Sequence, residues 1–480
     1  MSFTAKQVGS HNVADIKVSI IGGGVSGLST AYFLSRLGIR STIIEKSNRL
    51  GGLIKTDLIE GCQLEAGPDS YIATKPAVTE LSKELAGLHG EPLQDDVIGS
   101  NDARRRVLVV RRGHLIPLPK GMVMMAPAEW KPALTSKLFS TGTKLRFLRE
   151  TLSPPRERLG DISIEQLVVD HFGNEVLEYL AEPLLSGVYG GYAGQLSAQS
   201  VLPRFIEYER RYGSIVRGVR GERAARSQTA SMFLSFRGGM QTLTDSLARA
   251  IQPSCDVLYS EVTAVERTHG HWRIHTGGQS TEATHLVMAC PAYAAAALLR
   301  PEAPSLSSEL AAIPYSSAVL VTLVFEASKL NHALDAFGFL VPRAERKTIA
   351  AATWIATKFP SRIPHGLAAL RAFIVEPEAT ALLNASRDQL VELVVSDFER
   401  LMGIKAAPRF STVYFWPRSM PQYVVGHESC RERIAALASE YPGLHLVGNC
   451  YSGVGIPDCV RLAKETAKAV APGNGPSDIS

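Results

Sequence analysis

A glycine-rich turn near the start of the chain, residues 22–27 (Gly-Gly-Gly-Val-Ser-Gly), limits the possible folds more than any other segment. It follows residues 17–21, a β-branched run typical of a buried parallel strand. It precedes a helical repeat of leucine and alanine that Gly38 ends, and residues 41–45 have the pattern of a second strand. The sequence therefore predicts a βαβ unit of about 30 residues.

The spacing of the glycines suits the pyrophosphate of a dinucleotide. Gly22 permits a tight turn, Gly24 lets the backbone approach phosphate without a Cβ atom, and Gly27 lets the helix pack closely on the strand. The first helical turn offers free N–H groups and the positive end of the helix dipole. Glu45, at the end of the second strand, can accept hydrogen bonds from ribose hydroxyls. The pattern predicts an α/β, Rossmann-like domain but does not separate NAD from FAD.

Composition limits the possible size and class of the protein but does not indicate a function. The 480 residues are enough for two or three subdomains, and a net charge of +5 gives no reason to expect nucleic acid. We see no secretory signal and no apolar run long enough for a transmembrane helix. The six cysteines form no CxxC pair, and no histidine cluster has metal-binding spacing. We expect reduced thiols in a cytoplasmic enzyme without a metal, with weak patterning only at residues 1–15 and 472–480.

The middle of the chain differs from both ends. Residues 113–226 are rich in helix formers, proline and arginine, so we expect helices there. The arginines that crowd its second half are Arg210, Arg211, Arg217, Arg220, Arg223 and Arg226. They fit either a solvated basic face or a surface that meets anionic lipid.

Strand patterns return after residue 236. We predict a hairpin from residues 257–266 and 271–275, and strands at 285–290, 319–325, 370–375 and 445–447. A helix at 458–470 closes the pattern.

Two further motifs point to FAD. Arg49-Leu50-Gly51-Gly52 resembles the second glycine motif of two-domain flavoproteins of the flavin amine oxidase superfamily, in which this loop folds over the FAD pyrophosphate. Residues 237–240 (Arg-Gly-Gly-Met) resemble the point where the chain re-enters the flavin domain of that superfamily.

Motifs spread from residue 18 to residue 467 narrow the resemblance to the protoporphyrinogen oxidase family of haem biosynthesis. The segments that carry it are residues 67–70 (GPDS), 119–121 (PKG), 182–189 (EPLLSGVY), 420–423 (MPQY), 426–427 (GH) and 453–459 (GVGIPDC).

This resemblance implies a Rossmann-like two-domain FAD fold with three parts. Residues 15–90, 235–300 and 405–475 would form a discontinuous FAD-binding domain. Residues 91–112 and 301–404 would form the substrate-binding domain. Residues 113–234 would form a mainly helical membrane-binding insertion, which would place the enzyme peripherally on the cytoplasmic membrane.

The resemblance also implies an activity. Protoporphyrinogen IX would be oxidised to protoporphyrin IX in three two-electron rounds, with dioxygen as acceptor and hydrogen peroxide as by-product. Hydride would leave a bridging carbon of the macrocycle for the flavin, so no catalytic acid or base is expected. A homodimer is a further family expectation. Coproporphyrinogen III oxidation, an amine oxidase, a carotenoid desaturase and a porphyrin carrier without turnover remain alternatives.

Site residues follow from the same resemblance. For FAD they are Gly22, Gly23, Gly24, Val25, Ser26, Gly27, Glu45, Lys46, Arg49, Gly51, Gly52, Leu53, Gly67, Pro68, Asp69, Ser70, Val262, Trp416, Asn449, Val454, Gly455 and Ile456. For the substrate they are Arg106, which would bind a propionate, and the apolar walls Gly338, Phe339, Leu340 and Phe359. Arg105 is the alternative to Arg106, and Trp416, Phe339 and Phe359 could instead be core aromatics.

Overall fold

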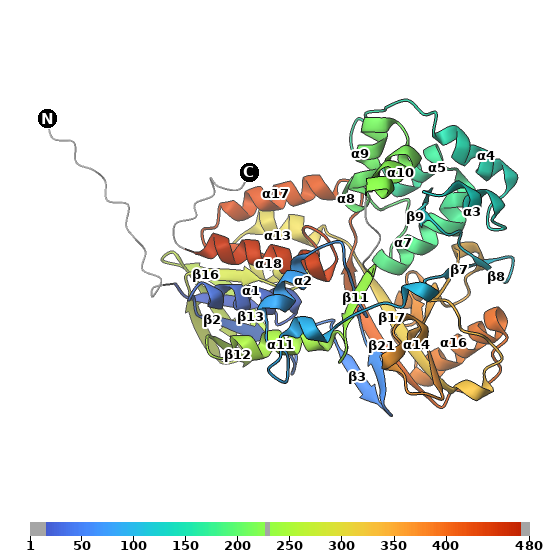
Figure 1. The fold of residues 1–480 in the computed structure, drawn as a ribbon. Coiled ribbons are helices and arrows are strands. Elements are labelled where there is room, and N and C mark those ends of the chain that lie inside the picture. Colours follow the sequence, from blue (N-terminus) through green and yellow to red (C-terminus); the bar gives the residue numbers. More distant parts are fainter. Residues whose placement is uncertain (1–15, 226–230, 472–480) are drawn as a thin grey trace.

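The structure is a computed structural model that describes residues 16–225 and 231–471 (Figure 1). The two weakly patterned ends and Arg226 lie outside the described residues. A parallel sheet with helices on both faces forms one side of the molecule, a larger sheet lies on the other, and a group of helices stands above that larger sheet (Figure 1).

The parallel sheet contains the predicted βαβ unit. Strand β1 (Val18–Ile21) is buried along its whole length, helix α1 (Val25–Arg36) follows, and β2 (Ser41–Glu45) returns beside β1. The strand order is β12-β2-β1-β16-β22. The added strands are β12 (Cys255–Tyr259), β16 (His285–Met288) and β22 (Leu444–Leu446). Segments from three distant parts of the chain therefore build one sheet.

Helices cover one face of this sheet. Helix α1 packs between α11 (Gln241–Ile251) and α18 (Ile456–Val470), and Leu28, Leu243 and Val460 lie in their shared core. On the other face lie α12 (Ala292–Leu299), α13 (Pro304–Ala311), α17 (His427–Ser439) and a small sheet of β13 (Val262–Thr268), β14 (His271–Thr276) and β15 (Gln279–Ala283).

The predicted strand at 257–266 is in fact two strands. Its first part belongs to β12, which pairs in parallel with β2, whereas β13 begins at Val262 and pairs antiparallel with β14. Ser260, between the two strands, donates its backbone N–H to the carbonyl oxygen of Glu45 at 2.9 Å. The hairpin prediction is therefore correct for β13 and β14 but missed the strand that joins the parallel sheet.

The larger sheet has seven strands in the order β21-β17-β20-β19-β18-β7-β8. Along β17 the odd-numbered residues Val319, Val321 and Leu323 pack against α16 (Arg387–Met402). The even-numbered residues face the opposite side, as the two-residue period of a strand requires. The strands are β7 (Val107–Arg111), β8 (His114–Pro117), β17 (Tyr315–Glu326), β18 (Gly338–Leu340), β19 (Ala351–Trp354), β20 (Leu367–Ile374) and β21 (Phe410–Pro421).

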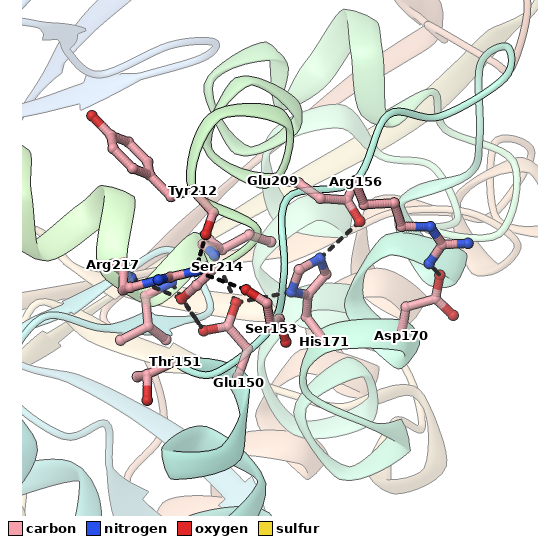
Figure 2. A network of polar contacts seen from close by, with 12 residues as sticks. Glu150, Thr151, Ser153, Arg156, Asp170, His171, Glu209, Tyr212, Ser214 and Arg217 are labelled. Carbon is pink, nitrogen blue, oxygen red and sulfur yellow. Dashed lines mark hydrogen bonds and ion pairs between the residues drawn. The ribbon is translucent and has the colours of Figure 1, made fainter.

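The helical group forms a separate core around Phe147, Phe172 and Leu180. Its helices are α3 (Trp130–Thr135), α4 (Thr141–Glu150), α5 (Ile164–His171), α6 (Asn174–Val176), α7 (Glu182–Tyr189), α8 (Ala198–Val201), α9 (Pro203–Tyr212) and α10 (Ile215–Ala225). A buried polar network that includes Glu150 and His171 joins α4, α5, α9 and α10 (Figure 2).

Smaller elements connect these parts. They are β3 (Thr56–Ile59), β4 (Cys62–Glu65), β5 (Tyr71–Ile72), α2 (Ala77–Glu84), β6 (Val97–Gly99), β9 (Met122–Val123), β10 (Ala126–Pro127), β11 (Phe233–Phe236), α14 (Ile355–Lys358) and α15 (Glu378–Ala381). Strands β8 and β21 pair within the seven-stranded sheet, although the domain limits expected above assign β8 to the helical insertion and β21 to the FAD-binding domain. We therefore propose that the substrate domain includes both strands.

Candidate functional site

The glycine turn after β1 has two tightly packed positions and one open position. A Cβ atom on Gly22, whose φ is +110°, would lie 2.6 Å from the carbonyl oxygen of Ala289. A Cβ atom on Gly27 would lie 2.0 Å from the carbonyl oxygen of Gly22. On Gly24, by contrast, the nearest atom would be the Cα of Gly52, 4.0 Å away. The protein itself requires Gly22 and Gly27, whereas Gly24 borders open space, as expected where a phosphate approaches the backbone.

The loop that contains Arg49 folds back over this turn. The backbone N–H of Gly51 donates to the carbonyl oxygen of Gly23 at 2.8 Å. The guanidinium of Arg49 donates to the carbonyl oxygens of Leu50 and Ile54, each at 3.1 Å, and to that of Gly52. Arg49 therefore holds the shape of its own loop and occupies that loop's carbonyl groups. Burial lowers the pKa of Arg49, and nearby Glu45 acts in the opposite direction.

Glu45 stands beside the glycine turn at the end of β2. Its Oε2 accepts from the N–H of Gly23 at 2.7 Å, and its Oε1 accepts from that of Ser47 at 2.8 Å. The neighbouring Lys46 is exposed. Val262 begins β13 shortly after the Ser260 contact to Glu45, so these two predicted FAD residues lie at the same end of the parallel sheet.

Residues 67–70 fill the space between the glycine loops and the seven-stranded sheet. A Cβ atom on Gly67 would lie 2.0 Å from the carbonyl oxygen of Leu53, so this segment packs directly on the loop after Gly52. The indole Nε1 of Trp416 on β21 donates to the carbonyl oxygen of Ala66 at 2.6 Å. The guanidinium of Arg371 on β20 donates to the carbonyl oxygen of Gly67 at 3.1 Å. The predicted cofactor segment is thus held from the substrate side.

Asp69, in the same segment, is paired with two cations. Its carboxylate accepts from Nζ of Lys358 at 2.8 and 2.9 Å, lies 3.3 Å from Arg371 and accepts from the Ser70 hydroxyl at 2.7 Å. Burial alone would raise the pKa of Asp69, but Lys358 and Arg371 hold it well below its usual range. Asp69 is therefore a fixed negative charge at the junction of the two sheets.

The beginning of α18 supplies a second helix N-terminus beside the first. Gly455 caps the helix, so residues 454–456 present backbone groups at the positive end of its dipole. The phenol of Tyr423 donates to the carbonyl oxygen of Asn449 and accepts from the N–H of Gly453, both at 2.8 Å. Helix α18 packs along α1, and burial raises the pKa of the Cys459 thiol while the Ser26 side chain on α1 acts in the opposite direction. The two helix N-termini that the sequence assigns to the cofactor therefore lie together.

The predicted substrate residues differ in their surroundings: Arg106 is partly exposed, whereas Phe339 and Phe359 are buried. Arg106 comes just before β7, and its carbonyl oxygen accepts from the N–H of Phe337, the residue before β18. The structure thus brings Arg106 and Gly338–Leu340 onto neighbouring strands. The Arg106 guanidinium bonds both the carboxylate and the carbonyl oxygen of Asp335, and its side chain is 43% exposed.

Two predicted wall residues are core residues in this structure. Phe339 is 1% exposed and meets Phe398 of α16 with ring centroids 6.4 Å apart, on the face of the sheet opposite to Leu340. Phe359 is also 1% exposed, and the guanidinium of Arg362 lies 4.7 Å from its ring centroid. Both rings are almost fully buried in the protein alone, which fits the core-packing alternative, and the substrate contact stays a prediction.

Sequence patterns did not single out Lys358, Arg371, Glu65 or Arg362. One usable signal was Arg371, a lone charge within the apolar strand β20, because a charge at such a position needs a buried partner. The partner could not be named from the sequence. Within residues 16–225 and 231–471, no group of three or more His, Cys, Asp or Glu side chains could hold a metal ion.

Comparisons with known proteins agree with this geometry. The model of the family described as "Flavin containing amine oxidoreductase" matches residues 25–471. A protein of Bacillus subtilis (strain 168) named coproporphyrinogen III oxidase is 31% identical over 461 residues, which cover 93% of this chain and 96% of that protein. A protein of Arabidopsis thaliana named protoporphyrinogen oxidase 2, chloroplastic/mitochondrial, is 26% identical, with 96% of each chain covered.

A solved structure extends the likeness to three dimensions. The crystal structure named "Putative protoporphyrinogen oxidase from Exiguobacterium sp. 255-15" superposes with a TM-score of 0.84 at 29% identity and covers 95% of this chain and 98% of that one. The predicted FAD cofactor and two-domain flavoprotein fold are confirmed by these matches. Because the family model spans residues 25–471, the chain belongs to the flavin-containing amine oxidoreductases.

Proposed function

We propose that this enzyme oxidises a porphyrinogen to a porphyrin, with protoporphyrinogen IX as the substrate that the sequence motifs favour. Six hydrogens leave the macrocycle in three rounds, and three molecules of dioxygen become hydrogen peroxide. This would be the penultimate step of haem biosynthesis. The observation that carries the proposal is that residues 66–70, packed on the nucleotide loops, are bonded directly to the seven-stranded sheet by Arg371 at Gly67 and by Trp416 at Ala66.

The chain's own part in this reaction is to orient and to exclude water. The flavin supplies the electron acceptor when it is bound. On the substrate side, Gly338 and Leu340 lie on the sheet face away from α16. That face also carries Arg371 and Trp416, which bond the segment beside the cofactor. A macrocycle placed against it would therefore lie next to the flavin.

Coproporphyrinogen III is a second candidate substrate. It is favoured by a small margin of identity: the Bacillus subtilis protein named coproporphyrinogen III oxidase is 31% identical to this chain, whereas plant proteins named protoporphyrinogen oxidase are 26% to 30% identical. Coproporphyrinogen III has two more propionates and would need more cationic contacts.

Turnover on both substrates decides between them. Purified protein should be yellow, and porphyrin fluorescence should develop in air after either porphyrinogen is added. The substrate with the higher kcat/KM is the physiological candidate. Oxidation of amines instead would contradict the porphyrinogen proposal, and porphyrin binding without turnover would support a carrier.

We also propose that the enzyme is cytoplasmic and lies peripherally on a membrane through α4 and the residues just after it. Leu145 and Leu148, three residues apart on one face of α4, are 57% and 40% exposed, and Leu152, in the turn just after the helix, is 81% exposed. Phe147 on the other face is fully buried. Leu159, which follows in the chain, is also fully exposed. These four leucines form what we call the leucine patch.

The surroundings of the leucine patch fit anionic lipid. Arg146, Arg149 and Arg156 are exposed around it, and α4 lies at the outer edge of the helical group (Figure 1). Apolar side chains flanked by basic ones are the pattern of interfacial binding. Within the described ranges, no helix is long and apolar enough to cross a bilayer.

Vesicle flotation tests the leucine patch. The protein should float with vesicles that contain phosphatidylglycerol at low salt, and replacement of Leu145, Leu148 and Leu152 by serine should abolish flotation. Leu58→Ser is the matched control, because Leu58 is 71% exposed on β3, outside the helical group. Equal flotation of the triple variant and the control would contradict the proposal.

A further inference from the structure

Five buried charged side chains meet where the seven-stranded sheet contacts the cofactor segment. We call them the junction cluster: Glu65, Asp69, Lys358, Arg362 and Arg371. The side chains of Glu65, Arg362 and Arg371 are 2%, 1% and 4% exposed, and those of Lys358 and Asp69 are 12% and 16% exposed. Removing this many charges from water costs free energy, so we expect the cluster to have a structural or functional role.

Part of that reason is mechanical. Arg362 pairs with Glu65 at 2.7 Å, while Arg371 contacts the Asp69 carboxylate and the carbonyl oxygens of Glu65 and Gly67. The Glu65 carboxylate also accepts from the N–H of Met240 at 2.8 Å. Strand β4 and the segment after it are thus fixed to the substrate side.

The charges of the cluster do not cancel. Two carboxylates face three cations, which leaves one excess positive charge. Burial raises the pKa of Glu65 despite the opposing effect of Arg362, and a proton on Glu65 would only increase the excess. In a site with little water, an uncompensated charge acts over a longer range than in bulk solvent.

The cluster lies along the wall of the cofactor site. Gly67 packs against Leu53 of the second glycine loop. Further along the same segment, Nζ of Lys75 pairs with Asp458 in the first turn of α18 at 2.6 Å. Residues 67–75 therefore run from the second glycine loop, which is predicted to cover the pyrophosphate, to the N-terminus of α18, where residues 454–456 are predicted to bind FAD. Asp69 and its two cations lie between these two points.

We propose that the excess positive charge of the junction cluster raises the reduction potential of the flavin. The two-electron reduced flavin is an anion, so a nearby buried positive charge stabilises it relative to the oxidised form. This inference rests on the proposed placement of the flavin against Gly67–Ser70. It assigns Lys358 and Arg371 an electronic role in addition to their structural one.

Two substitutions with opposite effects on the cluster charge test the proposal. Lys358→Met removes a positive charge and should make the two-electron reduction less favourable by about tenfold, which is a fall of about 30 mV. Asp69→Asn removes a negative charge and should shift the potential upward. Both are measured on the FAD-loaded protein against a reference dye, without any porphyrinogen, so the result does not depend on the substrate.

Three further variants and readouts separate charge from structure. Lys358→Arg keeps the charge and should retain the wild-type potential. If Asp69→Asn fails to fold, the comparison of Lys358→Met with Lys358→Arg still separates the effect of charge from that of structure. Lys329→Met is the surface control, because Lys329 is 61% exposed and pairs with Glu326. Sulfite, which adds to oxidised flavin and leaves a negative charge on it, should bind about tenfold more weakly to Lys358→Met.

A purely structural cluster would give a different result. Lys358→Met and Asp69→Asn would then lower thermal stability or FAD affinity with no change of potential, or would shift the potential in the same direction. Either outcome would overturn the inference while leaving the porphyrinogen proposal, which is tested by turnover, unaffected.

Discussion

The Nδ1 atom of His171 on α5 lies 2.8 Å from Oε1 of the Glu150 carboxylate on α4 (Figure 2). Its other ring nitrogen, Nε2, lies 3.1 Å from Oε1 of Glu209 on α9. Glu150 in turn accepts from the Ser214 hydroxyl and from the N–H of Ile215, at the start of α10. One imidazole between two carboxylates therefore ties together four helices.

The stability of the helical group should depend on the proton of His171. Burial lowers the pKa of His171, but the hydrogen bonds to Glu150 and Glu209 outweigh it and raise the pKa above 6.5. Arg156, Arg158 and Asp170 are further charged groups of this network. Because the folded-state pKa is the higher one, the stabilisation is complete below about pH 6.5 and is lost as the pH rises through the raised value.

Glu209 should make the helical group less stable at low pH. Burial raises its pKa, but His171 and Arg158 lower it to about 2. Its contribution to stability is present above about pH 4.5 and is lost as the pH falls toward 2.

The His171 dependence is tested with His171→Gln. The melting temperature of the wild type should fall as the pH rises through the raised pKa of His171, and this fall should be smaller in the variant. An unchanged alkaline slope would show that His171 does not carry this dependence.

Substitutions in the glycine turn should separate cofactor binding from folding. Gly24→Val should fold and lose FAD, because the space beside Gly24 is open in the protein alone. Gly27→Val should lose both, because its Cβ would lie 2.0 Å from a backbone oxygen. The flavin absorbance and the melting temperature of each variant measure the two effects. Full FAD content in Gly24→Val would contradict the proposed phosphate position.

Arg106 and Asp335 should affect KM in opposite directions. If Arg106 binds a propionate, Arg106→Ala should raise KM by about tenfold with little change in kcat, as expected for one charge-assisted bond. Asp335→Asn removes the carboxylate that holds Arg106 in this structure and should lower KM. Steady-state kinetics on both variants provide the check. If neither changes KM, the propionate contact belongs to Arg105 or to no arginine.

Tyr423→Phe should weaken FAD binding. The phenol makes two hydrogen bonds within residues 449–453, and each is worth about 1 kcal/mol. Without them the loop before α18 is less well fixed, so the dissociation constant for FAD should rise by about tenfold or more. Fluorescence titration measures it, with Tyr259→Phe as control because Tyr259 is 54% exposed. Equal affinities would show that loop order does not limit binding.

The parts of the site that could be predicted are those whose chemistry is local. Gly22, Gly27 and Glu45 belong to one βαβ unit, and their spacing alone requires the turn and the acid that the structure shows. The predicted wall around Phe339 takes no account of strand geometry. Gly338, Phe339 and Leu340 are consecutive in one strand, so the two-residue period already places the ring of Phe339 on the opposite face from Leu340.

Other features depend on contacts between residues far apart in the chain. Asp69 and Arg371 meet only because β20 crosses beneath the cofactor segment. The pairing of Arg106 with Asp335 has the same origin, since β7 and β18 become neighbours through the order of the larger sheet. Arg371 could be suspected of needing a buried partner, but the sequence names the partner in neither pair. Residue composition was enough to predict the strands, but the pairing of the strands and of their side chains depends on tertiary packing.

The discontinuous parallel sheet also determines when its domain can finish folding during translation. Helix α1, which emerges early from the ribosome, is covered by α18, and β22 completes the edge of the sheet. A nascent chain that has passed residue 400 therefore still exposes one flank of its first helix and lacks the second helix N-terminus. Because domains begin to fold while the chain is still being made, the early βαβ unit must wait for the last segments. We therefore expect stable binding of the cofactor only after residues 444–470 have been translated.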